Sequence, residues 1–412
     1  MSTRQSIVVV VGAGPAGLAT SQSLTSRGVD HVLLERGEVA NSWRTDRWDS
    51  LRLLTPNWMN RLPGDGEVDD RHGYMTATTL VDSLDRYRRV VDAPVVEHTA
   101  VTAVRRRSHG FTVDTDQGPW RCRAVVVASG AAGTPHIPAV ARELPPTIQQ
   151  LSALAYRHPD QLVRGEVLVV GASASGVQIA DELQRAGRNV TLAVGDHVRL
   201  PRTYRGRDIY WWLHAIGLLD ERYDAVDDLA RARRLPSPQV IGTPSRRPVD
   251  LNALHAIGVE ITGRLAGISA SRAQFSGSLA NLTASGDLKL NRLLDRIDRH
   301  VATHDDRHVD PPDRPEPTDL PSAGNEIPLA RFGSVVWATG YRPHHPWLDP
   351  ALLDGRGRIR HEGGVMQAAG MYVLGMPLTR RRSSAFIYGI AADARELTDQ
   401  LVRHLAAPAS AA

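Results

Sequence analysis

The 412-residue sequence contains a single cysteine, Cys122. One thiol excludes an internal disulfide, a Cys-x-x-Cys redox pair and a cysteine-based metal cluster. Long hydrophobic runs are also lacking, because stretches such as Ile7–Val11 and Val125–Ala128 fall far short of the roughly 20 residues that cross a bilayer. The opening residues MSTRQS show no charged-then-apolar signal pattern. We therefore expect a cytoplasmic protein with no membrane segment.

Lysine is nearly absent, since Lys289 is the only one and arginine supplies the remaining basic charge. The formal net charge is +4, but the basic residues are interleaved with aspartate and glutamate. The sequence has no basic helix stripe and no nucleic-acid-binding motif. A small polyanionic ligand explains this composition better than nucleic acid does. Hydrophobic residues make up 42% of the chain, which is enough for the cores of two domains.

The first 35 residues have the pattern of a dinucleotide-binding strand, turn and helix. Ser6–Val11 is an apolar, β-branched run typical of a buried parallel strand, and GAGPAG follows it. In such a turn the middle glycine lets backbone N–H groups approach a pyrophosphate. Glu35 ends the next strand, where an acidic residue binds a ribose hydroxyl. The predicted turn residues are Gly12, Gly14, Pro15, Ala16 and Gly17.

A second turn, VLVVGASASG, repeats this pattern about 160 residues further on. Its predicted contact residues are Gly171, Ser173, Ala174, Ser175 and Gly176. The strand that follows ends in VGDHVRLPRTYRGR instead of an acidic residue. Arg199 or Arg202 would grip a 2′-phosphate bidentately, which favours NADPH, while Asp196 leaves NADH open. The alternative is an arginine-rich solvated loop.

The two turns divide the chain into an α/β protein with two Rossmann-like dinucleotide-binding domains, the second inserted in the first. Residues 1–160 and 325–412 are predicted to form the FAD-binding domain, because a glutamate-ended unit suits permanently held FAD. Residues 161–324 are predicted to form the NADPH-binding domain with a helical insertion. The strand-and-turn segments 124–130 and 335–343 would mark the chain crossings between the domains.

Other segments have clear local patterns. Strand-like alternation predicts a small meander over 100–105, 110–115 and 120–122. A hairpin is predicted over 263–277 and an amphipathic helix over 287–301. The stretch 304–321 is rich in Asp, Pro and His, but without metal-ligand spacing, so we interpret it as a surface loop and expect no metal.

Five segments together resemble the class B flavin-dependent monooxygenase superfamily, of the flavin-containing monooxygenase and Baeyer–Villiger type, and in particular its short bacterial members. They are GAGPAG, the NSWR…WDSLRL region, GASASG, WATGYRP and YVLGMP. The resemblance implies that NADPH reduces FAD and that the reduced flavin takes up O2. A flavin C4a-(hydro)peroxide would then insert one oxygen atom into a small organic substrate. An NADPH-dependent flavin reductase or oxidase without oxygen insertion is the alternative.

The resemblance also implies contact residues, although it assigns no catalytic side chain. Those expected at FAD, besides the first turn, are Glu35, Arg36, Trp43, Arg44, Val101, Ala128, Gly130, Gly375 and Ser384. Those expected at NADPH are the second turn, Arg199 or Arg202, Thr339 and Gly340. A monomer or homodimer is expected, with the substrate and O2 as the only partners.

The sequence departs from the superfamily pattern at two places. Ser152 stands where the fingerprint before the second turn has histidine, although Tyr156 matches its last position. Leu54 stands where related enzymes carry an asparagine against the flavin. Neither serine nor leucine offers the same hydrogen bond. We therefore expect part of the NADPH consumed to yield hydrogen peroxide instead of oxygenated product.

Three aromatic residues from separate segments are candidates for an apolar substrate pocket. These are Trp58, Trp211 and Tyr388. The alternative is that they are ordinary core residues. The sequence does not indicate whether oxygen goes to nitrogen, sulfur, a ketone or an aromatic carbon.

Overall fold

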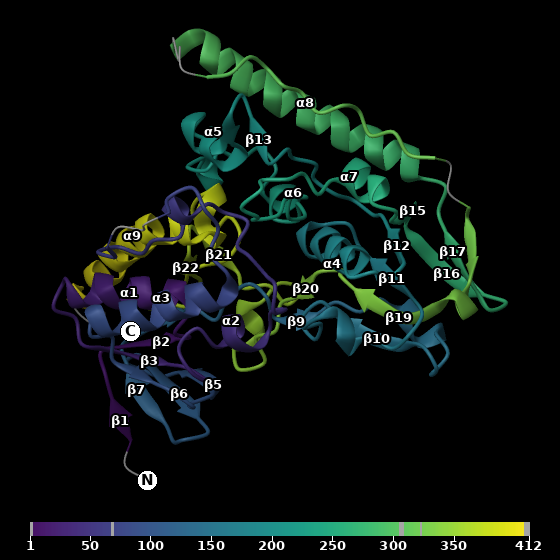
Figure 1. Ribbon diagram of the computed structural model, residues 1–412. Coiled ribbons are helices and arrows are strands. Elements are labelled where there is room, and N and C mark those ends of the chain that lie inside the picture. The colour runs from purple at the N-terminus through teal and green to yellow at the C-terminus, as the bar shows by residue number, and fades with distance from the viewer. Residues whose placement is uncertain (1–2, 67–69, 305–308, 322–323, 408–412) are drawn as a thin grey trace.

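The computed structural model describes residues 3–66, 70–304, 309–321 and 324–407. Two helix-covered sheets lie beside one another, the first at the left of Figure 1 and the second at the right. The chain begins in the first sheet, crosses to the second, and returns to the first before its last helix. Among the described residues, no helix is both long and apolar enough to cross a membrane.

The first sheet is built around β2 (Val8–Val11), whose four valines are all buried. It pairs in parallel with β3 (His31–Leu34) on one side and β8 (Ala124–Val127) on the other. β-branched residues suit a strand buried on both faces, which explains this apolar run. The outer strands are β4 (Val95–Val96) beyond β3, and β23 (Met371–Val373), β22 (Val365–Met366) and β21 (His361–Glu362) beyond β8.

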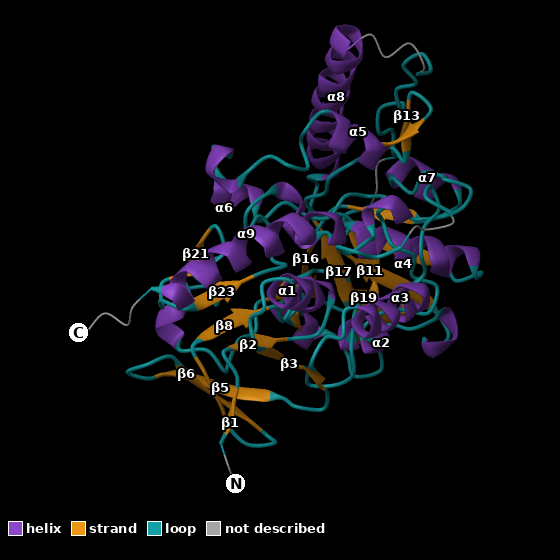
Figure 2. Ribbon diagram, turned by 90° about the vertical axis from the view of Figure 1, so that its left-hand side faces the viewer, coloured by secondary structure: helices purple, strands orange, loops and turns teal. Residues whose placement is uncertain are grey.

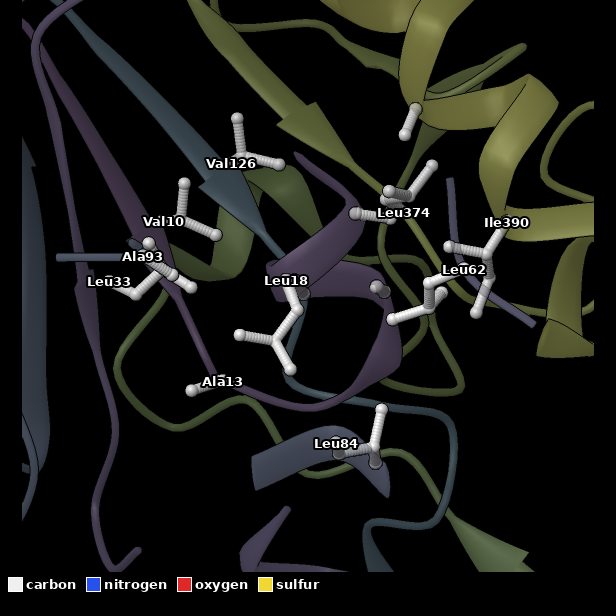
Figure 3. Packing of buried hydrophobic residues seen from close by; sticks show 14 of the residues in the cluster. Val10, Ala13, Leu18, Leu33, Leu62, Leu84, Ala93, Val126, Leu374 and Ile390 are labelled. Atoms are coloured by element: carbon white, nitrogen blue, oxygen red, sulfur yellow. The ribbon is translucent and has the colours of Figure 1, made fainter. Parts of the chain in front are cut away.

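Helices cover one face of the first sheet, and a small additional sheet covers the other face. The helices are α1 (Pro15–Thr25), α3 (Ala77–Val90) and α9 (Ile387–Ala406), with the short α2 (Asn41–Thr45) beside α3. Leu18 of α1 lies among side chains from β2, β8 and α9, so both chain ends share one core (Figure 3). The small sheet has the order β1 (Arg4–Gln5), β7 (Trp120–Cys122), β6 (Phe111–Thr115), β5 (Val101–Arg106), which confirms the predicted meander.

The second sheet is parallel throughout. Its order is β10 (Gln149–Ser152), β19 (Phe332–Trp337), β11 (Glu166–Val170), β12 (Val190–Ala193), β15 (Glu260–Thr262). α4 (Ala174–Arg185) and α7 (Leu251–Ala256) pack on it. The predicted boundaries assigned β10 and β19 to the first domain, and the pairing corrects this. β19 lies between β10 and β11, so the second domain needs residues from both sides of the predicted limits.

Two crossing segments join the sheets. β9 (Thr134–Pro135), which follows the first of these segments, pairs with β20 (Tyr341–Arg342) of the second, a pairing that was not predicted. Figure 1 shows this pair between the two halves of the molecule. Short 3-10 helices occupy Asn57–Met59, Ala139–Glu143, Pro159–Gln161, Tyr223–Ala225, Leu329–Arg331, Pro350–Leu352 and Arg382–Ala385.

The remaining elements belong to the second domain and lie outside its five-stranded sheet. They are β13 (Thr203–Tyr204), β14 (Arg207–Asp208), α5 (Ile209–Ala215), α6 (Leu229–Ala232), β16 (Leu265–Ser269), β17 (Arg272–Phe275), α8 (Leu279–His304) and β18 (Glu326–Pro328). β16 and β17 confirm the predicted hairpin. α8 is longer than predicted at both ends and lies beside α5 (Figure 2). Leu290 and Leu294 of α8 belong to the same hydrophobic cluster as Ile209 and Trp212 of α5. Residues 309–321 contain no helix or strand, whereas 305–308 of the predicted loop lie outside the described residues.

The sheet order yields a test of the domain limits. A fragment of residues 145–342 contains all five strands of the second sheet, whereas 161–324 lacks β10 and the internal strand β19. We expect the longer fragment to unfold cooperatively on heating, because the cooperative unit must include its internal strand. The shorter fragment should show no such transition by circular dichroism. Equal cooperativity of the two fragments would contradict the assignment.

Candidate functional site

The first turn is pressed against the end of β8. Gly12 has a φ of +105°, and a Cβ there would lie 2.6 Å from the carbonyl oxygen of Ala128. A Cβ on Gly17 would overlap the carbonyl oxygen of Gly12. By contrast, a Cβ on Gly14 meets no heavy atom within 4 Å. Gly12 and Gly17 are thus required by the protein's own packing, while Gly14 faces open space where a pyrophosphate fits.

The second turn repeats this geometry against the end of β19. A Cβ on Gly171 would overlap the carbonyl oxygen of Ala338, and one on Gly176 would overlap that of Gly171. Ser173, in the middle position, has φ −81° and ψ −178°, close to −82° and −170° at Gly14. It makes no side-chain capping bond to α4, so its hydroxyl is available to an anion at the helix N-terminus. Both turns therefore fit a dinucleotide pyrophosphate.

The ends of the second strands differ between the two units. Glu35 is buried after β3, and its carboxylate accepts the N–H of Ala13 at 2.8 Å and that of Gly37 at 3.3 Å. These bonds hold a carboxylate beside the first turn, where a ribose fits. Val194 occupies the corresponding place in the second unit and is fully buried. The acid that follows, Asp196, is 77% exposed and paired with Arg264 at 3.2 Å.

A cavity of about 2150 Å³ lies between the two sheets. It brings together residues predicted from separate motifs: Gly171, Ser173, Ala174 and Ser175 of the second turn, Gly130 of the first crossing, and Thr339 and Gly340 of the second crossing. Met376, Pro377 and Phe386 form part of its first-domain wall. The Thr339 hydroxyl donates to the carbonyl of His136, which ties the two crossings together. This cavity would let a nucleotide on the second turn reach a group held by the first domain.

The other residues expected at FAD lie around the first turn and the start of α9. Gly375 packs so closely on α1 that its Cβ would be 2.9 Å from the Cβ of Ala16. The buried Ser384 hydroxyl accepts the N–H groups of Arg380 and Arg381 at 3.0 and 2.9 Å. Trp43 is half-buried and contacts the cores of both domains. Their contacts with FAD remain predictions.

Three further FAD candidates have contacts that limit their roles. Arg44 pairs with Asp85 and donates to a backbone carbonyl, so protein groups occupy its guanidinium. Arg36 is largely exposed, with only a 3.9 Å approach to Asp46. Val101 begins β5, is partly exposed, and pairs with Thr115 of β6.

Arg199 and Arg202 do not line the cavity, and this corrects the predicted 2′-phosphate site. Arg199 is buried and forms ion pairs of 2.6 Å with Asp250 and with Asp287. Arg202 pairs at 2.6 Å with Asp208 and stacks on tyrosine rings. Two buried guanidinium groups already neutralised by neighbouring carboxylates have little to offer a phosphate. Arg264, which does line the cavity, was not predicted as a site residue, because it follows β15 and belongs to no local motif.

The two departures from the superfamily pattern lie in packed surroundings. Ser152 is buried at the end of β10, where its hydroxyl accepts the N–H of Ala155 at 3.3 Å. Tyr156 is fully buried and donates to Glu182 of α4 at 2.9 Å. The carbonyl oxygen of Leu54 accepts a bond of 2.8 Å from Arg202. Neither Ser152 nor Leu54 lines the cavity.

The predicted aromatic pocket is only partly assembled. The rings of Trp58 and Tyr388 lie 5.8 Å apart, and both contact His214 at 5.5 Å. Trp211 instead packs edge-on against Trp212 at 4.7 Å. None of the three predicted residues lines the cavity, so a role of theirs in substrate binding stays a prediction. The aromatic side chains on the cavity wall are Tyr223, Tyr341 and Phe386.

Several buried titratable groups, of which His361 lines the cavity, have shifted pKa values. Burial, with the charge of Arg233, lowers the pKa of His361 to about 4, so this imidazole is neutral at pH 7. Burial raises the pKa of Asp393, in α9 below the Ser384 loop, to about 6. Burial also raises the pKa of the Cys122 thiol to about 12, which removes its nucleophilic form. No His, Cys, Asp or Glu group among the described residues is arranged to hold a metal ion.

Comparison with known proteins agrees with this geometry. The pyridine nucleotide-disulphide oxidoreductase family matches residues 9–212. An uncharacterized CzcO-like oxidoreductase of Geobacillus kaustophilus is 30% identical over 96% of this chain and 98% of its own. A probable indole-3-pyruvate monooxygenase of Arabidopsis thaliana, YUCCA4, is 26% identical over 96% of this chain and 90% of its own.

A solved flavin-containing monooxygenase from Stenotrophomonas maltophilia has the same fold, with a TM-score of 0.69 and 20% identity over 98% of this chain and 100% of its own. The fold and site thus define a flavin-dependent oxidoreductase with two dinucleotide-binding domains. The chain belongs to the family of the CzcO-like oxidoreductases, within the class B flavin-dependent monooxygenase superfamily. This confirms the resemblance seen in the sequence motifs.

The contrast between Gly14 and Gly17 provides a direct test of the first turn. In a Gly14→Val protein the new side chain points into space that the protein leaves open, so we expect a normally folded protein that is colourless because FAD is excluded. Gly17→Val, as the matched variant, should fail to fold because its Cβ overlaps the carbonyl of Gly12. Thermal melting and flavin absorbance of the purified proteins measure both effects. Full retention of FAD by folded Gly14→Val would contradict the assignment.

Proposed function

We propose that this chain is an NADPH- and O2-dependent FAD monooxygenase that inserts one oxygen atom into a small organic substrate. The observation that carries the proposal is the presence of two turns of equal geometry, with the second opening into a cavity bounded by the first domain. The similarity to monooxygenases over nearly the whole chain supports it. A cytoplasmic location and a monomeric or homodimeric state stay predictions.

The first domain would hold FAD, which supplies hydride acceptance and O2 activation when bound. The backbone N–H groups at the start of α1 would bind its pyrophosphate, and Glu35 would accept a ribose hydroxyl. The N-terminus of α9, which follows Phe386 on the cavity wall, carries the positive end of the helix dipole. That dipole would stabilise negative charge on a reduced ring system.

The second domain would present the nicotinamide cofactor. Ser173 and the N-terminus of α4 would bind the pyrophosphate, and Thr339 and Gly340 lie on the route from there to the first domain. We propose NADPH as the cofactor because Val194 replaces the acid that would bind a free 2′-hydroxyl. Arg264, at the cavity beside Gly195, would exchange its exposed partner Asp196 for the 2′-phosphate.

An NADPH-dependent oxidase or reductase without oxygen insertion is the second candidate. Ser152 and Leu54 favour it, because neither places a hydrogen-bond donor at the cavity. The two candidates differ in where the oxygen goes, and that difference is measurable.

Oxygen transfer is tested by turnover of the FAD holoenzyme with NADPH under 18O2. We expect one labelled oxygen atom in the organic product, and hydrogen peroxide release that falls when substrate is added. The assay compares NADPH consumed, peroxide formed and label incorporated for a panel of amines, sulfides, ketones and organic acids. Peroxide equal to NADPH consumed with every compound of the panel would favour the oxidase.

Coenzyme choice is tested by Arg264→Ala. Loss of one exposed charge-assisted bond costs about 1–2 kcal/mol, so the KM for NADPH should rise roughly 5- to 30-fold while that for NADH changes little. Arg272→Ala is the matched control, because Arg272 pairs with Glu326 outside the cavity and should change neither value. An unchanged KM for NADPH in Arg264→Ala would show that the 2′-phosphate binds elsewhere.

A further inference from the structure

Arg233 is a partly buried arginine on the cavity wall that lacks a counter-charge among the described residues, whereas the other cavity arginines without a carboxylate partner, Arg234, Arg342, Arg356 and Arg360, are exposed. Arg233 follows α6, which lies above β21 in both overall views (Figures 1 and 2). Its guanidinium donates to the carbonyl of Leu378 at 3.1 Å and lies 3.3 Å from the Nε2 of His361. Its Nε is buried without a partner, and within the described part of the chain no carboxylate pairs with it. The contrast with Arg199 and Arg202 is plain, since each of those has its own carboxylates.

The surroundings of Arg233 disfavour the charged form of its guanidinium. Burial, helped by the nearby Arg358, lowers the pKa of the Arg233 guanidinium. Arg358 is itself paired with Asp354 at 2.8 Å, so that carboxylate is already engaged. His361 is a neutral imidazole and cannot neutralise a cation. A partly buried charge without a partner is costly, so this site is incomplete until an anion binds.

The position of Arg233 separates it from the proposed phosphate sites. Its two contacts, Leu378 and His361, both belong to the first domain. Leu378 follows the cavity residues Met376 and Pro377 beyond β23, with a left-handed φ of +50° that holds its carbonyl in place. The second turn and Arg264, which would bind the phosphates of NADPH, are carried by the second sheet.

The same cavity also has an apolar lining that faces solvent. Leu235, Tyr341 and Val365 are 50%, 41% and 37% exposed, and all three line it. Large exposed apolar side chains on a cavity wall favour a ligand with apolar surface. These apolar side chains, together with an arginine that has no carboxylate partner, favour a ligand with an apolar body and one acidic group.

We propose that Arg233 is the substrate-recognition residue and that the substrate is an apolar organic acid whose carboxylate pairs with it. A planar guanidinium binds a carboxylate through two parallel bonds, which suits recognition of this group. The identity of the reaction rests on the proposed function, but the binding does not. The acid therefore has to bind the oxidised holoenzyme without turnover.

The test uses FAD holoenzyme saturated with NADP+, titrated with phenylacetate and decanoate and with their neutral amides, phenylacetamide and decanamide. Binding is followed by calorimetry and by the change in the flavin spectrum. Each acid should bind the natural protein about 10- to 150-fold more tightly than its amide, the range of one charge-assisted pair. Arg233→Gln should abolish this preference, and Arg233→Lys should keep part of it.

Arg231→Gln is the matched control, because Arg231 lies on α6 outside the cavity lining and loses the same charge. It should keep the acid preference, and Arg233→Gln should keep its FAD content and its affinity for NADP+. Equal binding of acids and amides by the natural protein would overturn the proposal, as would a main effect of Arg233→Gln on NADP+. Acids that bind through Arg233 but are never oxygenated would contradict the proposed function alone.

Discussion

Each dinucleotide turn of this chain lies so close to the end of a neighbouring strand that its first residue has room only for hydrogen. Gly12 meets the carbonyl of Ala128, and Gly171 meets that of Ala338. Both carbonyls end strands that neighbour the turn's own strand, so the sheet order and the turn geometry depend on each other. The two crossing segments begin immediately after these contacts. The place where the two turns would bind nucleotides is therefore also the place where the domains are joined.

This arrangement accounts for the position of the cavity. The crossings leave the carboxyl ends of β8 and β19 and pair through β9 and β20, so the edges at which both turns lie are drawn together. Ligands in parallel sheets bind at such carboxyl edges. The inserted segment around α6 then reaches back to the first domain through Arg233 and completes one wall. The proposed function would use this cavity to bring a nicotinamide cofactor on the second turn to a group held by the first domain.

The sequence predicted those features that depend on interactions between residues close together in the chain. The turns, Glu35, the meander and the crossings were predictable because each depends on residues adjacent in sequence. The place of β19 was not, since its neighbours β10 and β11 lie far from it along the chain. Arg199 stands near the end of the expected strand, yet Asp250 and Asp287 from distant segments neutralise it. Arg264 and Arg233 gain their significance only from the cavity, and no motif marks them.

The proposed function requires the two turns to hold a nicotinamide cofactor and a flavin within hydride-transfer distance. Anaerobic rapid mixing of the FAD holoenzyme with NADPH, unlabelled or deuterated at the transferred position of C4, tests it most directly. We expect complete loss of the visible flavin absorbance with one equivalent of NADPH, and slower loss with the deuterated cofactor. A flavin that stays oxidised in the presence of both NADPH and NADH would contradict it.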